Sequence, residues 1–169
     1  MYPVQKNIDS RNVKSHFYIY FVLIPCAFIV FLDEWIKFFA IKTFPEEALL
    51  VSPKFIEFAI HKNYGLAFDV PFRLEFVIII SIILGLFLLR VVVKNIQQRP
   101  RIAFSIILIL LGASGNFYDR IVYGFTVDYI ILFGKSAINF SDLIIILGIL
   151  SLLVFSRKKH LTNQNIVVE

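Results

Sequence analysis

The sequence is poor in charged residues and in cysteine. Charged residues make up 17% of its 169 residues, hydrophobic residues make up 59%, and the mean hydropathy is +0.80. A soluble domain of this length could not bury so much apolar surface, so the composition predicts an integral membrane protein. The single cysteine, Cys26, excludes an intrachain disulfide and a cysteine-rich metal site.

Histidine is also scarce, which excludes two kinds of peptidase. His16, His61 and His160 are scattered and lack the HExxH spacing of a zinc protease, so we expect no metal and no cofactor. The Gly-Ala-Ser-Gly run at 112–115 fits the motif of a rhomboid-type serine protease, with Ser114 as nucleophile. That serine would need a histidine base on a neighbouring span, and all three histidines lie outside the apolar segments. The small residues instead predict a close approach between helices.

Four apolar segments predict four transmembrane helices. They cover about 17–36, 74–93, 102–118 and 138–155, each near the ~20 residues that cross a bilayer. No cleavage site of the A-x-A type follows the first segment, so we expect it to be retained as a span and not removed as a signal peptide. The whole chain, 1–169, is then one integral membrane domain.

The basic residues indicate how these spans are oriented. They concentrate in the N-terminal tail, between the second and third segments, and in the C-terminal tail, whereas the other two connections are balanced or acidic. The positive-inside rule therefore places both termini in the cytoplasm. The net charge of +5 is explained by orientation, and we expect no nucleic-acid partner. In the outer connection, about 37–73, the alternation at 54–63 is typical of a strand. The predicted fold is an all-α membrane protein with four transmembrane helices and a small extracytoplasmic β-structured platform.

Polar residues from several segments are predicted to lie at one depth, the outer interface. They are Asp33, Lys37, Asn63, Asn116, Asp119, Arg120, Asp128, Asn139 and Asp142. Individually, such residues are often helix caps, and Asp33 with Lys37 could be a simple ion pair between residues four apart. Together they are typical of an intramembrane site, because ionisable groups at this depth are costly.

Two aspartates of this set could share one proton and act on water together. One carboxylate would activate the water while the other protonates a leaving group, with no metal required. Asp142, at the head of the last apolar segment, is one member. Its partner is either Asp119 or Asp128, and spacing alone leaves that choice open.

Five ordered elements resemble those of bacterial lipoprotein signal peptidase (signal peptidase II). They are Asp33-Glu-Trp-Ile-Lys37, Asn63-Tyr-Gly65-Leu-Ala67-Phe68, Gly112-Ala-Ser-Gly-Asn116-Phe-Tyr-Asp119-Arg120, Gly124-Phe-Thr-Val127-Asp128, and Ile138-Asn139-Phe-Ser141-Asp142 followed by Gly148. The resemblance covers about 30–150. It implies an aspartic endopeptidase of the bacterial inner membrane, active at the outer leaflet, that removes the signal peptide from diacylglyceryl-modified prolipoproteins just before the lipidated cysteine.

The resemblance also implies roles for individual residues. It makes Asp128 and Asp142 the catalytic pair, and leaves Asp119 as a supporting residue, paired with Arg120 or hydrogen-bonded locally. Asn63, Asn116, Arg120 and Asn139 would line the substrate site, with Gly65 in a loop that clamps the peptide. Asp33 and Lys37 form the first-span motif. The expected partners are the lipid-modified prolipoprotein and membrane lipids, and the expected oligomeric state is a monomer.

The sequence departs from the family pattern near the predicted pair. Ser141 replaces an alanine, Leu143 replaces a small polar residue, Thr126 stands where valine is usual, and the connection from Asp128 to Asp142 is short. A specialised paralogue with altered substrate or inhibitor sensitivity is therefore one alternative. A non-enzymatic membrane protein, such as a complex subunit or chaperone, is the other.

Overall fold

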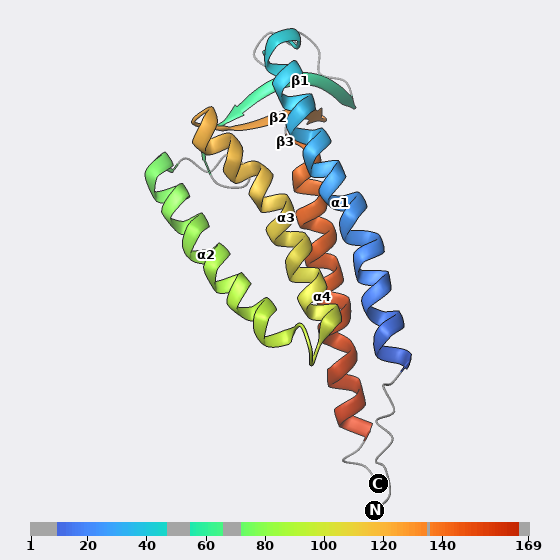
Figure 1. Ribbon diagram of the computed structural model, residues 1–169. Coiled ribbons are helices and arrows are strands. Elements are labelled where there is room, and N and C mark those ends of the chain that lie inside the picture. Colours follow the sequence, from blue (N-terminus) through green and yellow to red (C-terminus); the bar gives the residue numbers. More distant parts are fainter. Residues whose placement is uncertain (1–9, 47–54, 66–71, 135, 166–169) are drawn as a thin grey trace, which may run out of the picture.

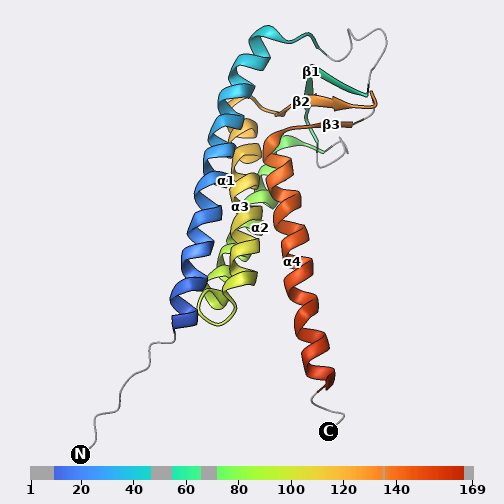
Figure 2. The ribbon, with the colours of Figure 1, turned by 90° about the vertical axis from the view of Figure 1, so that its right-hand side faces the viewer.

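Four helices and a small sheet make up the computed structural model, which describes residues 10–46, 55–65, 72–134 and 136–165, with side chains from residue 21 to residue 156. The elements are α1 (Ser10–Thr43), β1 (Ile56–Asn63), α2 (Leu74–Asn95), α3 (Pro100–Val122), β2 (Thr126–Leu132), β3 (Ser136–Ile138) and α4 (Phe140–Asn165). The helices extend from the sheet in one general direction, and the start of α1, the α2–α3 connection and the end of α4 lie at the opposite end (Figures 1 and 2).

The helices extend beyond the apolar segments from which they were predicted. Residues 37–43, assigned to the outer connection, continue α1, and α3 continues past 118 to Val122. The reason is that Lys37 and Asp119 are fully buried inside the protein, so a charge there does not mark the end of a helix. The helix predicted at 138–155 was placed to start two residues too early, because Ile138 is the last residue of β3 and α4 begins at Phe140.

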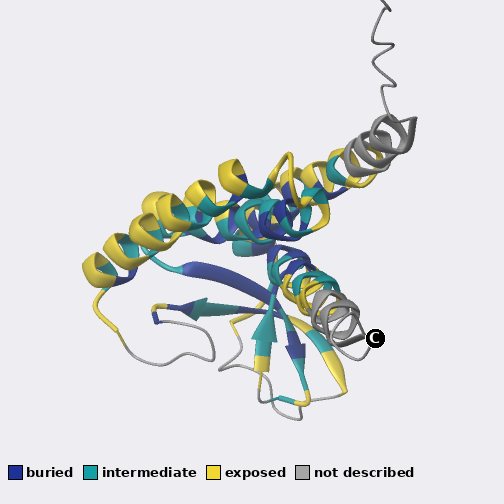
Figure 3. Ribbon diagram, turned by 90° about the horizontal axis from the view of Figure 1, so that it is seen from below, coloured by how far each residue is buried: buried dark blue, intermediate teal, exposed yellow. Residues whose placement is uncertain are grey.

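The helices differ in how much of their surface the protein covers. The α2 and α3 helices have the length and hydropathy to cross a membrane, and the apolar part of α4, Phe140–Ser156, is shorter. Of α2, only Val77 and Val92 are buried, so most of this helix is exposed apolar surface (Figure 3). The α3 helix packs between the others and has buried residues along its length. It therefore forms the centre of the bundle.

Glycines allow α3 and α4 to pack closely. A Cβ atom at Gly112 would lie 2.5 Å from the backbone oxygen of Ser141, and one at Gly148 would lie 2.9 Å from the backbone nitrogen of Ile109. Both distances are far below ordinary contact. The close helix approach predicted from the 112–115 run is therefore confirmed for Gly112.

The sheet is antiparallel with the order β1–β2–β3. It confirms the strand predicted at 54–63, of which Ile56–Asn63 forms β1, whereas β2 and β3 were not predicted. Between Phe58 and His61 the register shifts: Phe58 pairs with Ile130, but His61 pairs with Asp128. One extra residue in β1 thus makes a β-bulge in front of Asn63.

Candidate active site

The candidate site lies where the sheet meets the adjacent ends of the helices. Asp128 lies on β2 and Asp142 in the first turn of α4. Asn139, between β3 and α4, lies between these two aspartates in the chain and is fully buried. The short β2–β3 hairpin turns at Phe133 and Gly134, which both have positive φ, and so returns the chain from Asp128 to Asp142.

Three asparagines hold the two aspartates. The Asp128 carboxylate accepts hydrogen bonds from Nδ2 of Asn139 at 2.7 Å and from Nδ2 of Asn63 at 3.2 Å. The Asp142 carboxylate accepts one from Nδ2 of Asn116 at 2.7 Å and one from the backbone nitrogen of Asn139 at 3.2 Å. Asn139 thus contacts both aspartates, and each of the four carboxylate oxygens accepts one N–H.

Asp142 also caps the helix that carries it. Its backbone nitrogen donates to Oδ1 of Asn139 at 2.9 Å, while its carboxylate accepts from the Asn139 backbone nitrogen. This reciprocal pair has the geometry of a capping box at the start of α4. Capping was the simpler explanation of an aspartate here, and it is correct. It also fixes the carboxylate, which still accepts from Asn116 through its other oxygen.

Burial makes the ionised form of Asp128 costly. The side chain is 2% exposed. Burial is the main cause that raises the pKa of Asp128 to about 8, and the nearby charge of Asp142 is the second. Hydrogen bonds from Asn63 and Asn139 act in the opposite direction. Asp128 therefore carries a proton at neutral pH, as one member of a proton-sharing carboxylate pair must.

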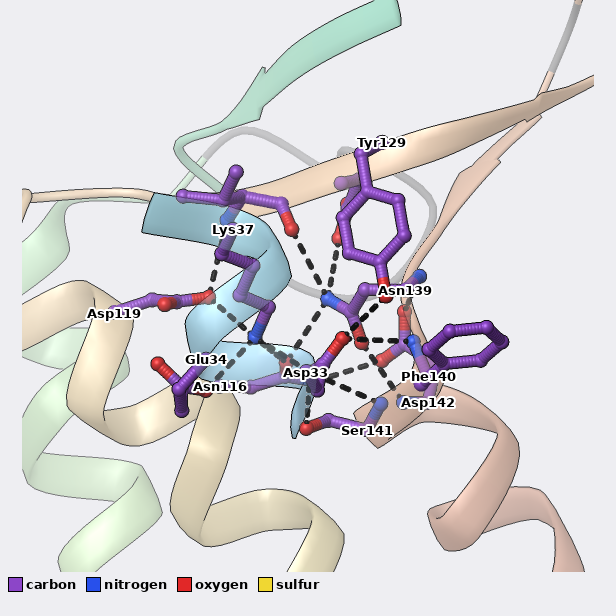
Figure 4. A network of polar contacts seen from close by, with 12 residues as sticks. Asp33, Glu34, Lys37, Asn116, Asp119, Tyr129, Asn139, Phe140, Ser141 and Asp142 are labelled. Atoms are coloured by element: carbon purple, nitrogen blue, oxygen red, sulfur yellow. Dashed lines mark hydrogen bonds and ion pairs between the residues drawn. The ribbon is translucent and has the colours of Figure 1, made fainter. Parts of the chain in front are cut away.

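A second polar cluster lies beside the pair, around Lys37 of α1 (Figure 4). The ammonium is 2.9 Å from Asp33, in the ion pair that their spacing predicts, 2.8 Å from Asp119 of α3, and 3.1 Å from Glu34. The side chains of Lys37, Asp33 and Asp119 are all 0% exposed. Lys37 also donates to Oδ1 of Asn116 at 3.5 Å, which links this cluster to the residue that holds Asp142.

Two contacts were expected for Asp119, an ion pair with Arg120 or a local hydrogen bond, and the ion pair with Arg120 is wrong. Neighbouring helix positions point in different directions, and Asp119 instead contacts Lys37 and accepts from the backbone nitrogen of Val127 at 3.1 Å. Arg120 donates to the backbone oxygens of Asn116 at 3.2 Å and of Gly65 at 3.1 Å. It thereby connects α3 to the chain after β1, while its buried Nε has no hydrogen-bond partner among the residues that the structure describes.

All the residues predicted for the site lie in these two connected clusters. Ala67 and Phe68 of the second motif lie outside the described residues. Sequence reasoning missed Glu34 and Tyr129, and it treated Ser141 only as a departure from a pattern. Tyr129 and Ser141 both donate to Asp33, at 2.6 Å each. Their signal in the sequence is position alone: each is next to a predicted catalytic aspartate.

Two other chemistries are not supported by the geometry. Ser114 is exposed, and its hydroxyl donates to the Leu111 backbone oxygen at 2.6 Å within its own helix, so it is not placed as a nucleophile. Within the part of the chain that the structure describes, no three side chains among His, Cys, Asp and Glu are grouped to hold a metal ion. The polar groups that surround Asp128 and Asp142 are amides, and the neighbouring cluster adds the Lys37 ammonium and the hydroxyls of Tyr129 and Ser141.

Comparison with known proteins assigns the family. The family model of signal peptidase (SPase) II, Peptidase_A8, matches residues 25–158. The lipoprotein signal peptidase of Caldicellulosiruptor bescii is 34% identical to this chain, and the match covers 79% of this chain and 87% of the relative. The lipoprotein signal peptidase of Staphylococcus aureus strain Newman is 28% identical, and the match covers 84% of this chain and 90% of the relative. A solved structure of a bacterial membrane enzyme, 27% identical, superposes with a TM-score of 0.70 over 81% of this chain and 88% of its own. The chain therefore belongs to the signal peptidase II family of membrane peptidases.

Proposed function

We propose that this peptidase is an aspartic endopeptidase that removes the signal peptide from diacylglyceryl-modified prolipoproteins, with Asp128 and Asp142 as its catalytic pair. The observation that carries the proposal is the shared contact of Asn139, which donates from Nδ2 to Asp128 at 2.7 Å and from its backbone to Asp142 at 3.2 Å. One residue thereby orients two carboxylates that come from different elements. Asp119, the other candidate partner, is instead in contact with the Lys37 ammonium.

The pair would work with one proton between its two members. Asp128, whose pKa is raised to about 8, holds that proton at neutral pH, and the Asp142 carboxylate accepts a proton from water. The water oxygen bonds to the carbonyl carbon that precedes the lipidated cysteine. When the carbon–nitrogen bond breaks, Asp128 gives its proton to the departing amine. One proton remains on the pair, now on Asp142, and its return to Asp128 completes the cycle.

Substrate binding is proposed for the residues around Gly65. Arg120 ties the Gly65 backbone oxygen to α3 at 3.1 Å, and Asn63 accepts from the Gly65 backbone nitrogen at 3.0 Å. These bonds hold the chain after β1 close to Asp128. The buried Nε of Arg120, which has no partner in the described part of the chain, would donate to a peptide carbonyl of the substrate, because a buried donor without a partner gains the most from one.

The topology proposed is that of four spans in the bacterial inner membrane, with both termini in the cytoplasm and the site at the outer leaflet. The arrangement of the helices supports it: the basic α2–α3 connection, the start of α1 and the end of α4 are at one end, and the sheet and polar clusters are at the other (Figure 1). The exposed apolar surface of α2 would contact lipid. A monomer could perform the reaction, since both aspartates come from one chain.

The test is cleavage of a synthetic diacylglyceryl-modified prolipoprotein peptide by purified protein in micelles. Asp128→Asn and Asp142→Asn should each lower kcat by about a thousandfold or more, as loss of an acid–base group in a dyad does. Glu75→Gln is the matched control, since Glu75 is 68% exposed at the start of α2. Retained cleavage by either aspartate variant would refute the proposal, and a wild type that binds but never cleaves the peptide would favour a non-enzymatic role.

A further inference from the structure

Asp33 contacts the immediate neighbours of both proposed catalytic aspartates. Its Oδ1 accepts from the Tyr129 hydroxyl at 2.6 Å, and its Oδ2 accepts from the Ser141 hydroxyl at 2.6 Å. Tyr129 follows Asp128 directly on β2, and Ser141 precedes Asp142 directly on α4. One buried carboxylate on α1 thus joins the two segments that carry the pair (Figure 4).

We propose that Tyr129 and Ser141 are positioning residues, whose hydroxyl bonds to Asp33 set the separation of the Asp128 and Asp142 carboxyl groups. This inference rests on the proposed function, because it assumes that this pair does the chemistry. It adds a requirement that lies outside the pair itself: a common anchor on a third element.

The anchor is held firmly enough to serve this purpose. Asp33 is 0% exposed, and its carboxylate is also 2.9 Å from the Lys37 ammonium. Lys37 in turn contacts Asp119 on α3, so the position of Asp33 is fixed by two helices. Hydrogen bonds from a hydroxyl to a carboxylate are short and roughly twice as strong as neutral ones. The two hydroxyl bonds are therefore stiff ties to a fixed point.

The hydroxyl bonds are additional to those that hold α4 in place. Asp33 also accepts from the backbone nitrogens of Phe140 at 3.1 Å and Ser141 at 3.2 Å, and so satisfies donors at the start of that helix. Removing either hydroxyl leaves these backbone bonds intact. The helix start should survive, while the tie between Asp33 and the position next to a catalytic aspartate is lost.

The packing around Ser141 leaves its hydroxyl little freedom. Ser141 is fully buried, and a Cβ atom at Gly115 of α3 would collide with its Oγ. The glycine therefore makes room for the hydroxyl in the orientation that reaches Asp33. Tyr129 is likewise 2% exposed, and its ring packs edge-on against Phe140 at a centroid distance of 5.9 Å.

The inference is tested with Tyr129→Phe, Ser141→Ala and the double variant, each of which removes only hydroxyl oxygens. Tyr118→Phe and Ser105→Ala are matched controls, since Tyr118 is 51% exposed, and the buried Ser105 donates within its own helix to the Arg101 backbone oxygen at 3.0 Å. The measurements are kcat and KM for the diacylglyceryl-modified peptide in micelles, and the thermal midpoint of each variant.

The expected result is a loss of about tenfold in kcat for each single variant, with KM within about twofold of wild type, because a small misplacement of reacting groups lowers the rate of the chemical step. The double variant should lose less than the product of the two single losses, since cutting one tie already frees the separation. The controls should cleave like wild type.

Three outcomes would overturn the inference: a kcat for both single variants within about twofold of the controls, losses that appear only in KM, or losses explained by a lower thermal midpoint. The aspartate variants separate this failure from failure of the proposed function. If Asp128→Asn and Asp142→Asn are inactive while Tyr129→Phe and Ser141→Ala cleave normally, only the positioning role is wrong.

Discussion

The Lys37 ammonium lies 2.8 Å from a carboxylate oxygen of Asp119, and both side chains are fully buried. This ion pair joins α1 to α3 at the level of the candidate site. Asp33 and Glu34 also lie within 3.1 Å of the same ammonium, so three carboxylates share one cation. Removing it would leave several buried oxygens uncompensated.

Lys37→Met should therefore destabilise the protein strongly. Breaking a buried ion pair by removing one partner costs about 3–5 kcal/mol. Thermal unfolding in micelles should show a large drop in the midpoint. Lys42→Met is the control, because Lys42 is exposed and lies over the Phe38 ring, 3.7 Å from its centroid. Equal effects of the two substitutions would contradict the structural role of Lys37.

Activity should fall as the pH rises through about 8. Burial and the charge of Asp142 raise the pKa of Asp128 to about 8, so the proton that the leaving amine needs is present below that pH and lost above it. The same shift stabilises the fold at low pH: its contribution is fully present below the usual aspartate value and is lost as the pH rises through the raised one. The measurement is kcat between about pH 6 and 10, with the folded fraction followed in parallel. A kcat that is constant or increases across pH 8 would show that Asp128 is not the proton donor.

Asn139→Ala should impair both catalysis and stability. It removes the Nδ2 donor to Asp128 and the Oδ1 acceptor of the α4 cap. We expect kcat to fall by about a hundredfold through misplaced carboxylates, and stability to fall by about 1 kcal/mol through the lost cap. Asn95→Ala is the control, since Asn95 donates only along α2, to the Val91 backbone oxygen at 2.8 Å. A variant that keeps wild-type kcat would remove Asn139 from the site.

Alanine at Gly112 or Gly148 should force α3 and α4 apart. The added Cβ would lie 2.5 Å from the Ser141 backbone oxygen or 2.9 Å from the Ile109 backbone nitrogen, and overpacking of this kind costs about 1–3 kcal/mol. Gly85→Ala on α2 is the matched control, because a Cβ there meets nothing within 4 Å. Thermal midpoints in micelles measure the difference. If all three variants unfold alike, the helices do not pack through these glycines.

The helices and β1 could be predicted because their signals are local. Apolar runs and an alternating strand pattern depend only on neighbouring residues, and the structure has a helix at each run and a strand at Ile56–Asn63. The helix ends could not be predicted in the same way. Charged residues inside α1 and α3 looked like ends, because the partner that makes their burial possible, Lys37 for Asp119, lies on another helix.

The membership of the site could be predicted better than its contacts. The topology predicted from the sequence placed the polar residues at one depth in the membrane, but their spacing could not decide whether Asp119 or Asp128 is the partner of Asp142. That choice depends on which aspartate lies beside the Lys37 ammonium and which contacts Asn139. The first contact joins two helices distant in sequence, and the second depends on how the β2–β3 hairpin folds back. Tyr129 was missed for the same reason, because its partner Asp33 is distant in the chain. Glu34 did have a local signal, since its partner Lys37 is three residues later on the same helix.

The bulge in β1 decides which side chain the strand presents to Asp128. Side chains alternate between the two faces of a strand, so one extra residue reverses the alternation beyond it. With the bulge, His61 pairs with Asp128 and Asn63 with Thr126, and the Asn63 amide reaches the Asp128 carboxylate at 3.2 Å. If the register of Phe58 with Ile130 continued without the bulge, Lys62 would pair with Thr126 and would occupy the position that Asn63 now holds. The bulge therefore brings the Asn63 amide, and not the Lys62 ammonium, to the Asp128 carboxylate, so a change that restored a regular register in this strand without changing its length would replace the asparagine by a cation at the site.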